Sequence, residues 1–272
     1  MQFGVCGDVT MTAAAARASY DFAEWTVGAL LKPRESQDVF CAALDVLRAA
    51  ELPYPIVNCF VPSDLKITGS AVDNAALQAY VTKTMERAER ASVRVIVFGS
   101  GGARCIPDGF DPGIAHDQLV SFCRMAAPLA HDHGVTVVVE PLNKADCNVL
   151  TTVDECAVLV REVAHPAIRL LVDTYHLMRD DDSYESIVLH GELLAHVHIA
   201  TVKNRLAPGA EPCDFSRFFG ALAKAQYTGR ISIEAAIRIP ETELPAALTM
   251  MRKLAGIGID EDSNKPSGGG VQ

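Results

Sequence analysis

The sequence predicts an α/β protein that folds as a single (β/α)8 barrel, and three observations support this prediction. First, short apolar, β-branched runs recur along the chain, as expected of parallel strands that are buried on both faces. Second, segments with helical periodicity separate these runs. Third, the 272 residues divide into eight units of 34 residues each, and a chain of about 250 residues is typical of this barrel.

The eight apolar runs are expected to be the strands of the barrel. They are Phe3–Cys6, Phe22–Trp25, Pro55–Phe60, Val93–Phe98, Val135–Glu140, Ile168–Asp173, Leu194–Ile199 and Ile231–Ala235. An open, doubly wound sheet is the runner-up. It is disfavoured because no GxGxxG follows the first strand and no GxxxxGK[ST] occurs anywhere in the chain.

The helices are expected between the strands, the first of them before residue 20. The others are Gln37–Ala50, Asn74–Ala91, Ile114–His133, Val153–Ala164, Ser183–His190, Phe215–Ala225 and Glu241–Ala255. Short polar side chains that can cap a helix N-terminus stand at Asp73, Thr152, Asp182 and Asp214. We assign residues 1–257 to the barrel. Residues 258–272 are polar and glycine-rich, and are expected to form a flexible tail outside it.

Composition and charge narrow the functional class. Hydrophobic residues make up 49 % of the chain and the mean hydropathy is +0.16, which excludes a disordered chain, a collagen and a coiled coil. With 24 basic and 34 acidic residues, the formal net charge is −10. This charge opposes binding to nucleic acids and anionic membranes, so the expected partner is a small molecule. A homodimer or homotetramer stays open.

The sequence also favours a cytoplasmic location. No run approaches 18 apolar residues, and no basic segment precedes the alanine run near the start, so neither a transmembrane helix nor a signal peptide is expected. The eight cysteines include no CxxC pair and several lie in apolar runs. Reduced thiols in the cytosol are the expected state.

Four consecutive predicted strands end in residues that suit a metal ion. They are Glu140, Asp173, His198 and Glu234, at spacings of 33, 25 and 36 residues, each close to one β/α unit. In a barrel of this kind the carboxyl ends of the strands meet at one mouth, where active sites lie. The alternative is that each acid caps a helix or pairs with an arginine. His196, two residues before His198, is expected to pack in the interior or to support the site.

Three carboxylates and one imidazole indicate a single divalent cation per chain. Oxygen-rich sites favour Mn²⁺ or Mg²⁺, and an imidazole favours Mn²⁺, Co²⁺ or Zn²⁺, so Mn²⁺ is the expected ion. Two further features are less specific. The GSGGAR segment at residues 99–104 either cradles an anion or sugar or is a permissive turn, with Arg104 directed to the mouth or to solvent. Trp25, the only tryptophan, either forms a wall of the substrate site or packs the barrel.

Several motifs resemble one known family. The segments are EPLNKADCNVLTT, DTYHL, HVHIA, NRLAPG and YTGRISIEA, which span the last four predicted strands, about 100 residues. In order and content they resemble the sugar phosphate isomerase/epimerase superfamily, the xylose isomerase-like TIM barrels. Within it the likeness is greatest to ketose 3-epimerases of the D-tagatose/D-allulose type.

The resemblance implies roles for particular residues. Glu140, Asp173, His198 and Glu234 correspond to the family's metal ligands, and the two glutamates also to its catalytic acid/base pair. His176 and Arg205 correspond to residues that contact the sugar, and Asp146 stands where the family has a longer acid with that role. In one respect the chain departs from the family, because HIATVKNR lacks the short acidic stretch that commonly follows the HxH pair.

The implied chemistry is proton transfer at a carbon next to a carbonyl. A metal ion that chelates the carbonyl oxygen and the neighbouring hydroxyl acidifies the C–H bond and stabilises an enediolate. Glu140 removes the proton from one face and Glu234 returns one on the other, or the reverse, which suits a ketose 3-epimerase acting on a sugar or sugar phosphate. An inosose dehydratase-like lyase and a hydroxypyruvate isomerase-like enzyme are the alternatives on the same barrel.

Two rival functions use other features. A metal-dependent AP endonuclease would need extra histidines after the third and fourth strands, where the chain has Asn58, Cys59, Gly99 and Ser100. The negative net charge also opposes binding to a phosphate backbone. A barrel that only binds a ligand would not need an intact pair of acid/base glutamates. Both are therefore disfavoured.

Overall fold

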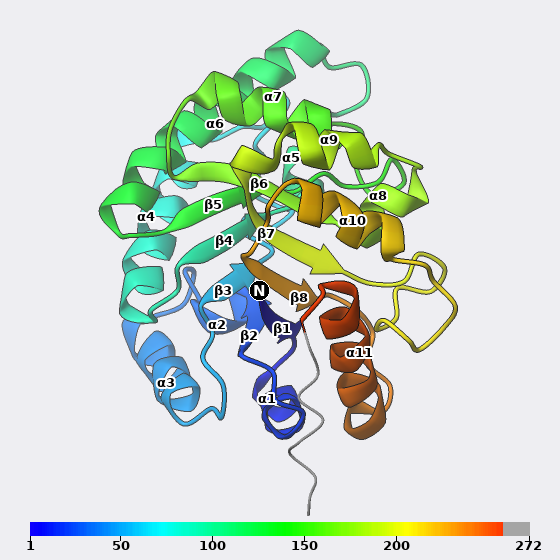
Figure 1. Ribbon diagram of the computed structural model, residues 1–272. Coiled ribbons are helices and arrows are strands. Elements are labelled where there is room, and N and C mark those ends of the chain that lie inside the picture. Colours follow the sequence, from blue (N-terminus) through cyan, green and yellow to red (C-terminus); the bar gives the residue numbers. More distant parts are fainter. Residues whose placement is uncertain (258–272) are drawn as a thin grey trace, which may run out of the picture.

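The computed structural model describes residues 1–257 and shows a closed barrel of eight parallel strands in chain order (Figure 1). The strands are β1 (Gln2–Cys6), β2 (Phe22–Thr26), β3 (Ile56–Asn58), β4 (Val95–Phe98), β5 (Thr136–Val139), β6 (Ile168–Asp173), β7 (Leu194–Ile199) and β8 (Arg230–Ile233). Pairing of β1 with β8 closes the barrel and rules out the open sheet. The predicted tail, 258–272, lies outside the described residues.

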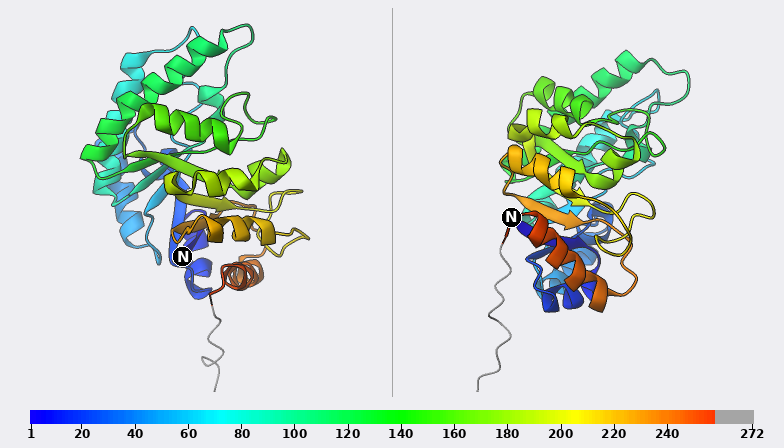
Figure 2. Two further views of the ribbon diagram at one scale, coloured as in Figure 1. Left: turned by 45° about the horizontal axis from the view of Figure 1, so that its top comes forward. Right: turned by 45° about the vertical axis from the view of Figure 1, so that its right-hand side comes forward.

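The helices surround the barrel, as both turned views show (Figure 2). They are α1 (Val9–Arg17), α2 (Val27–Leu30), α3 (Gln37–Arg48), α4 (Asn74–Arg90), α5 (Gly101–Arg104), α6 (Pro112–Asp132), α7 (Val153–Val163), α8 (Thr174–Arg179), α9 (Tyr184–Leu189), the 3-10 turn η1 (Gly191–Leu193), α10 (Ser216–Lys224) and α11 (Pro240–Leu254). Among the described residues, no helix is both long and apolar enough to cross a membrane.

Two of the four predicted caps are confirmed and two are wrong. Asp73 and Thr152 each accept a backbone N–H at the start of α4 and α7. The cap of α9 is Ser183 rather than Asp182, whose carboxylate instead accepts the first N–H of α7, 2.9 Å away. Asp214 lies one residue before the N-cap position of α10, although its carboxylate still accepts from the helix N-terminus.

The interior of the barrel is layered. Side chains two residues apart in a strand face the same side of the sheet. An inward-facing residue is therefore followed, two positions later, by another inward-facing residue that lies one level nearer the carboxyl end of the barrel. The apolar part is a cluster of Phe22, Ile56, Val95, Val97, Val138 and Leu171, in which Val95 and Val97 lie at successive levels of β4. The layer above it is polar and consists of Cys6, Glu24, Asn58, Glu140, Asp173, His198 and Glu234.

Gly4 of β1 shows how tightly the lower layer is filled. It is paired with Phe22 of β2, and a Cβ atom at Gly4 would lie 2.2 Å from the Phe22 ring. The missing side chain therefore lets the aromatic ring fill the centre of the barrel. This packed floor excludes water from below and leaves the polar layer open only at the carboxyl ends of the strands.

Candidate active site

The four residues predicted to bind a metal ion meet at the carboxyl end of the barrel. Glu140 directly follows β5, Asp173 ends β6, His198 lies within β7 and Glu234 directly follows β8. Each offers one ligand atom, and these atoms all lie within 4.8 Å of one another. Of the four, only Glu234 is not fully buried. The arrangement suits a small cation.

His198 lies between the two glutamates. Its Nδ1 atom is 3.2 Å from Glu140 Oε1 and 3.2 Å from Glu234 Oε2. Burial alone would lower the pKa of His198, but the carboxylates of Glu24 and Glu234 outweigh it and raise the pKa well above its usual value. The cluster therefore has a strongly negative field, which favours a positive charge at its centre.

Glu24 of β2 is a site residue that the sequence did not reveal. It is fully buried, and its two carboxylate oxygens each lie 3.0 Å from a histidine Nε2, one from His198 and the other from His196. Burial raises the pKa of Glu24, yet the charge on His198 and the hydrogen bond from His196 bring the net pKa well below the usual range. An ionised Glu24 therefore accepts both Nε2–H groups, which directs Nδ1, the other ring nitrogen of His198, toward the carboxylates of Glu140 and Glu234.

A signal for Glu24 was present in the sequence. It is the one acid inside the second apolar run, FAEWT, and a buried strand admits a carboxylate only where a donor meets it. Its partners belong to β7, far away in the sequence, so their identity depended on barrel closure. His196, predicted to pack or to support the site, does so through Glu24 and through Ser232, whose Oγ is 3.2 Å from His196 Nε2.

Asp173 has one oxygen occupied and one unpartnered. Oδ1 accepts the backbone N–H of Tyr175 at the start of α8, whereas buried Oδ2 has no hydrogen-bond partner among the described residues. Burial raises the pKa of Asp173 to about 6, although the neighbouring His176 lowers it. A buried oxygen without a donor is costly, and a metal ion bound beside it would remove that cost.

His176 is held in one tautomer by the loop after β5. Its Nδ1 atom accepts the backbone N–H of Asn143 at 3.0 Å, so this nitrogen bears no proton and the ring proton is on Nε2. The Nε2 atom lies 3.6 Å from Asp173 Oδ2, at the edge of the candidate metal-ligand cluster. Asp146 is fixed by the same loop, because Asn143 Nδ2 donates to its carboxylate at 2.7 Å.

Arg205 approaches the cluster from the loop after β7. Its guanidinium lies 2.5 Å from Glu234 Oε2 and 3.6 Å from Asp173 Oδ2, and its charge stacks over the Tyr175 ring at 4.6 Å. Burial raises the pKa of Glu234, but the positive charges of His198 and Arg205 outweigh burial and bring the net pKa below its usual value. Glu234 is therefore a carboxylate, while Arg205 offers donors at the rim of the site.

Two adjoining cavities of about 290 and 300 Å³ open over these residues and share Asn58, Cys59, Arg205 and Glu234. Trp25 lines the first cavity and its ring also packs on Tyr54, 6.3 Å away between centroids. Trp25 thus packs on a neighbouring ring and also faces the cavity, and its contact with a substrate stays a prediction. Asp146 and His176 line the second cavity, so all the predicted site residues surround one mouth.

Both expectations for Arg104 are wrong. It points neither to the mouth nor to solvent but is fully buried. Its guanidinium donates to the backbone carbonyls of Phe98, Glu140 and Leu150 at 2.9, 2.7 and 3.2 Å. The end of β5, including Glu140, is thereby tied to the loop after β4. Residues 101–104 of the GSGGAR segment form α5, and residues 99–102 line the second cavity.

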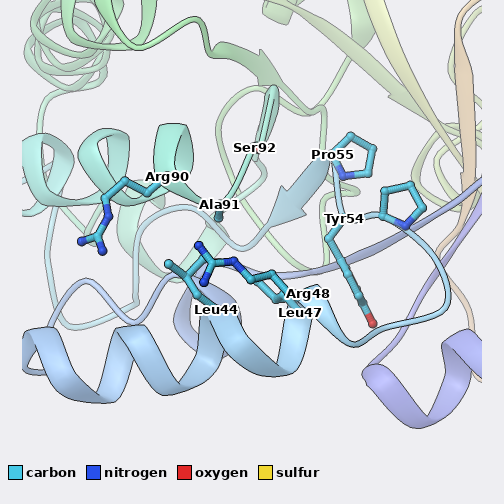
Figure 3. Close-up of a pocket in the computed structure, with 9 residues that line it drawn as sticks. Leu44, Leu47, Arg48, Tyr54, Pro55, Arg90, Ala91 and Ser92 are labelled. Carbon is cyan, nitrogen blue, oxygen red and sulfur yellow. The ribbon is translucent and has the colours of Figure 1, made fainter.

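Another cavity, of about 190 Å³, lies away from this mouth (Figure 3). It is bordered by Leu44 and Leu47 of α3, by Pro55 just before β3, and by Ser92 between α4 and β4. These positions precede their strands, so the cavity lies toward the amino-terminal face of the barrel. Active sites of such barrels lie at the opposite end.

Comparison with known proteins agrees with this fold. D-psicose 3-epimerase of Agrobacterium fabrum is 29 % identical over 215 residues, 74 % of this chain and 72 % of that protein. L-ribulose 3-epimerase of Methylomonas sp. is 28 % identical over 251 residues, 89 % of this chain and 83 % of that protein. A crystal structure of D-psicose 3-epimerase from Clostridium cellulolyticum has the same fold, with a TM-score of 0.81 at 19 % identity, covering 94 % of this chain and 99 % of that one.

The match to a family extends over nearly the whole barrel. Residues 12–254 match the family described as xylose isomerase-like TIM barrel. This range includes every strand from β2 to β8 and all the site residues described above except Cys6. The protein therefore belongs to the xylose isomerase-like TIM barrel family.

Proposed function

We propose that the protein is a divalent-cation-dependent ketose 3-epimerase. One observation supports this most strongly: Glu140 and Glu234 stand on either side of His198, each 3.2 Å from its Nδ1 atom. An epimerase needs one acid/base group for each face of the substrate carbon. The two relatives described above are named as epimerases of ketoses, which agrees with the prediction of an isomerase-class enzyme.

The chain's donor set fits a divalent cation. Glu140, Asp173, His198 and Glu234 would hold it, since they combine three hard oxygen ligands with one imidazole. Asp173 Oδ2 has no hydrogen-bond partner among the described residues, and it lies in the same cluster as His198 Nδ1, which contacts the carboxylates of Glu140 and Glu234. When bound, such a cation supplies Lewis acidity toward the oxygens of a ketose. Mn²⁺ is the ion that we expect.

The proton transfers belong to the two glutamates. Glu234, which Arg205 and His198 keep ionised, is suited to accept the proton from the substrate carbon next to the carbonyl. Glu140 donates to the opposite face of the resulting planar enediolate, and the roles reverse for the other epimer. Because epimerisation runs in both directions between the two epimers, each glutamate has to serve as an acid in one direction and as a base in the other.

The remaining predicted residues orient the sugar. His176 presents Nε2–H to the site, since Asn143 occupies Nδ1, and so can donate to a hydroxyl or carbonyl oxygen. Arg205 and Asp146 line the same cavity and offer a charged donor and a charged acceptor. Trp25 forms an apolar wall on the other side of the mouth.

The proposal is tested by following carbon-bound protons. The metal-free protein is reconstituted with Mn²⁺ and incubated in D₂O with a panel of ketoses, their phosphates and inososes, and the products are followed by NMR. We expect deuterium to enter at C3 of a ketose together with formation of its C3 epimer, and chelation by EDTA to abolish both. Absence of carbon-bound exchange in every substrate would contradict the proposal.

The same spectra separate the related reactions. An aldose product indicates proton return to the neighbouring carbon, as in a hydroxypyruvate isomerase-like enzyme. Loss of a hydroxyl from an inosose indicates a dehydratase-like lyase. Either outcome would keep the metal site but replace the 3-epimerase assignment.

A further inference from the structure

Two cysteines outside the metal-ligand cluster are in direct contact. The Sγ atoms of Cys105 and Cys147 are 2.9 Å apart, about 0.9 Å longer than a disulfide bond of about 2.05 Å. Cys105 follows α5 in the loop after β4, and Cys147 lies in the loop after β5. The two thiols therefore come from neighbouring loops at the mouth of the barrel and meet between them.

Other contacts already hold these loops in register. The Asn148 side chain donates to the carbonyl of Ile106 at 2.9 Å and accepts the N–H of Ile106 at 2.8 Å. The Cys105 thiol also lies 3.6 Å from the carbonyl oxygen of Asp146. Because the backbones on both sides are fixed, a covalent bond between the sulfurs needs only a small movement of two side chains.

The two thiols differ in exposure. Cys105 is partly exposed, while Cys147 is 3 % exposed. Burial, together with the adjacent Cys147, raises the pKa of Cys105 to about 11. Since the thiolate is the attacking species, we expect thiol exchange at this pair to be slow at neutral pH and to need prolonged contact with an oxidant.

We propose that Cys105 and Cys147 form a reversible disulfide on exposure to a small disulfide such as oxidised glutathione. The Cys105 thiolate attacks one sulfur of oxidised glutathione, breaks its S–S bond and releases one glutathione thiolate. Cys147 then attacks the Cys105 sulfur, breaks the mixed disulfide and releases the second. The two cysteines together lose two protons and two electrons, and oxidised glutathione becomes two glutathione thiols.

The disulfide bond would hold in place the turn after β5 that carries Asp146. Cys147 directly follows Asp146, and its backbone N–H donates to the carbonyl of Asn143, the residue that holds His176. Closing a segment with a sequence separation of 42 residues also restricts the unfolded chain. The oxidised protein is therefore expected to be more stable, with this turn attached to the loop after β4.

Peptide mapping of the full chain tests the proposal. The reduced protein is incubated with oxidised glutathione, free thiols are blocked by alkylation, and the digest is analysed by mass spectrometry. We expect one cross-linked peptide pair joining Cys105 to Cys147, and a rise in Tm of roughly 5 °C or more that dithiothreitol reverses. C105S and C147S should each lose both effects, while C41S, a half-exposed cysteine of α3, should keep them.

Several outcomes would overturn the proposal. They are a stable glutathione adduct on Cys105, free thiols at both positions after the exposed Cys59 has reacted, and a rise in Tm that persists in C105S. If a serine variant does not fold, the cross-linked peptide in the wild-type chain decides alone. Neither readout uses catalysis, so the result is independent of the proposed epimerase activity.

Discussion

Glu140 and Glu234 flank the same imidazole nitrogen but have different neighbours. Glu234 pairs with Arg205 at the rim, whereas Glu140 lies deeper, with its side chain over Gly99 and its backbone carbonyl bound by Arg104. The two carboxylates thus approach the space between them from separate strands. This asymmetry suits two groups that serve opposite faces of one carbon atom.

Replacing either glutamate by glutamine should abolish turnover and preserve the fold. In Glu140→Gln and Glu234→Gln the amide keeps the volume and one oxygen ligand but transfers no proton, and general acid–base catalysis is worth about 10²–10⁴-fold. Epimerisation rate and bound metal are measured together, because weaker metal binding would deepen the loss. Near wild-type turnover in either variant with metal bound would remove that glutamate from the mechanism.

Gly99 provides the space for the Glu140 carboxylate. A Cβ atom at this position would lie 2.3 Å from Glu140 Oε2, so Gly99→Ala should displace the carboxylate. We expect metal affinity and epimerisation to fall by at least about tenfold, in the range of changes that disturb ligand orientation, with an unchanged circular dichroism spectrum. Gly28→Ala is the matched control, because nothing lies within 4 Å of its Cβ position. Equal effects of the two substitutions would refute the argument.

Glu24 contacts the proposed metal site through the histidines. Glu24→Gln keeps the shape but places an NH₂ group against one of two Nε2–H groups, which should disturb the orientation of His198. Loss of such a partner typically costs 10–100-fold in metal affinity, and we expect that loss in Mn²⁺ titrations, with a smaller effect on kcat at saturating Mn²⁺. Glu86→Gln, which removes a surface partner of Lys83, should leave the affinity unchanged. An unaltered Mn²⁺ affinity in Glu24→Gln would contradict this role.

At the level of elements, Glu211 organises the loop after β7. The chain lacks the acidic stretch that commonly follows the HxH pair, and Glu211 occupies the loop instead. Its carboxylate accepts hydrogen bonds from the Thr201 hydroxyl and from both the backbone and the side chain of Asn204. Arg205, the next residue, has a left-handed backbone conformation with φ of 50°. This conformation is energetically unfavourable for residues other than glycine. Glu211 thus helps to hold the arginine in that conformation.

Removing the Glu211 carboxylate should weaken substrate binding more than chemistry. In Glu211→Ala three hydrogen bonds to a charged acceptor are lost, so the loop that carries Arg205 should loosen and KM should rise roughly tenfold. We expect kcat to change less, because both glutamates of the site stay in place. Glu211→Gln keeps one acceptor oxygen and should recover part of the effect. A fall in kcat with unchanged KM would assign Glu211 another role.

Most helices were predictable, including the six-residue α9, but three other short helices were not. Helical periodicity identified α3, α4, α6, α7, α10 and α11 to within a few residues. The helices α2, α5 and α8 have four to six residues and begin within three residues of a strand end. They escaped prediction because so few turns, directly after an apolar strand, show no separate periodicity. The wrong cap at Asp182 has a different cause, since a carboxylate next to one helix binds the N-terminus of another.

At the scale of the whole molecule, we expect the folded protein to be more stable with a bound divalent cation than without one. Without a bound cation, the site holds three carboxylates close together, two of them buried, and their negative charges repel one another. A bound Mn²⁺ would neutralise this repulsion. At Mn²⁺ about 100-fold above its Kd, binding to the folded state alone adds about 2.7 kcal/mol, or roughly 5–10 °C in Tm. Differential scanning fluorimetry with and without EDTA measures the shift. Asp173→Asn should abolish most of it, and an equal shift in that variant would place the ion elsewhere.

The sequence by itself determined the architecture and the positions of the four predicted metal ligands. Eight apolar runs separated by helical segments are sufficient for a barrel, and strand ends in such a barrel converge. Glu140, Asp173, His198 and Glu234 could therefore be assigned to one mouth from their spacing alone. The resemblance to ketose 3-epimerases implied roles for the residues around them.

Only the tertiary structure decided the supporting contacts. Glu24 meets His198 across the barrel, Arg104 turns inward to three carbonyls, and Cys105 meets Cys147 between two loops. These pairs are far apart in the sequence or depend on the direction of one side chain, and no periodicity encodes them. Their partners are set by barrel closure and by the need to satisfy every buried polar group. That need can be recognised in a sequence, but the group that satisfies it cannot.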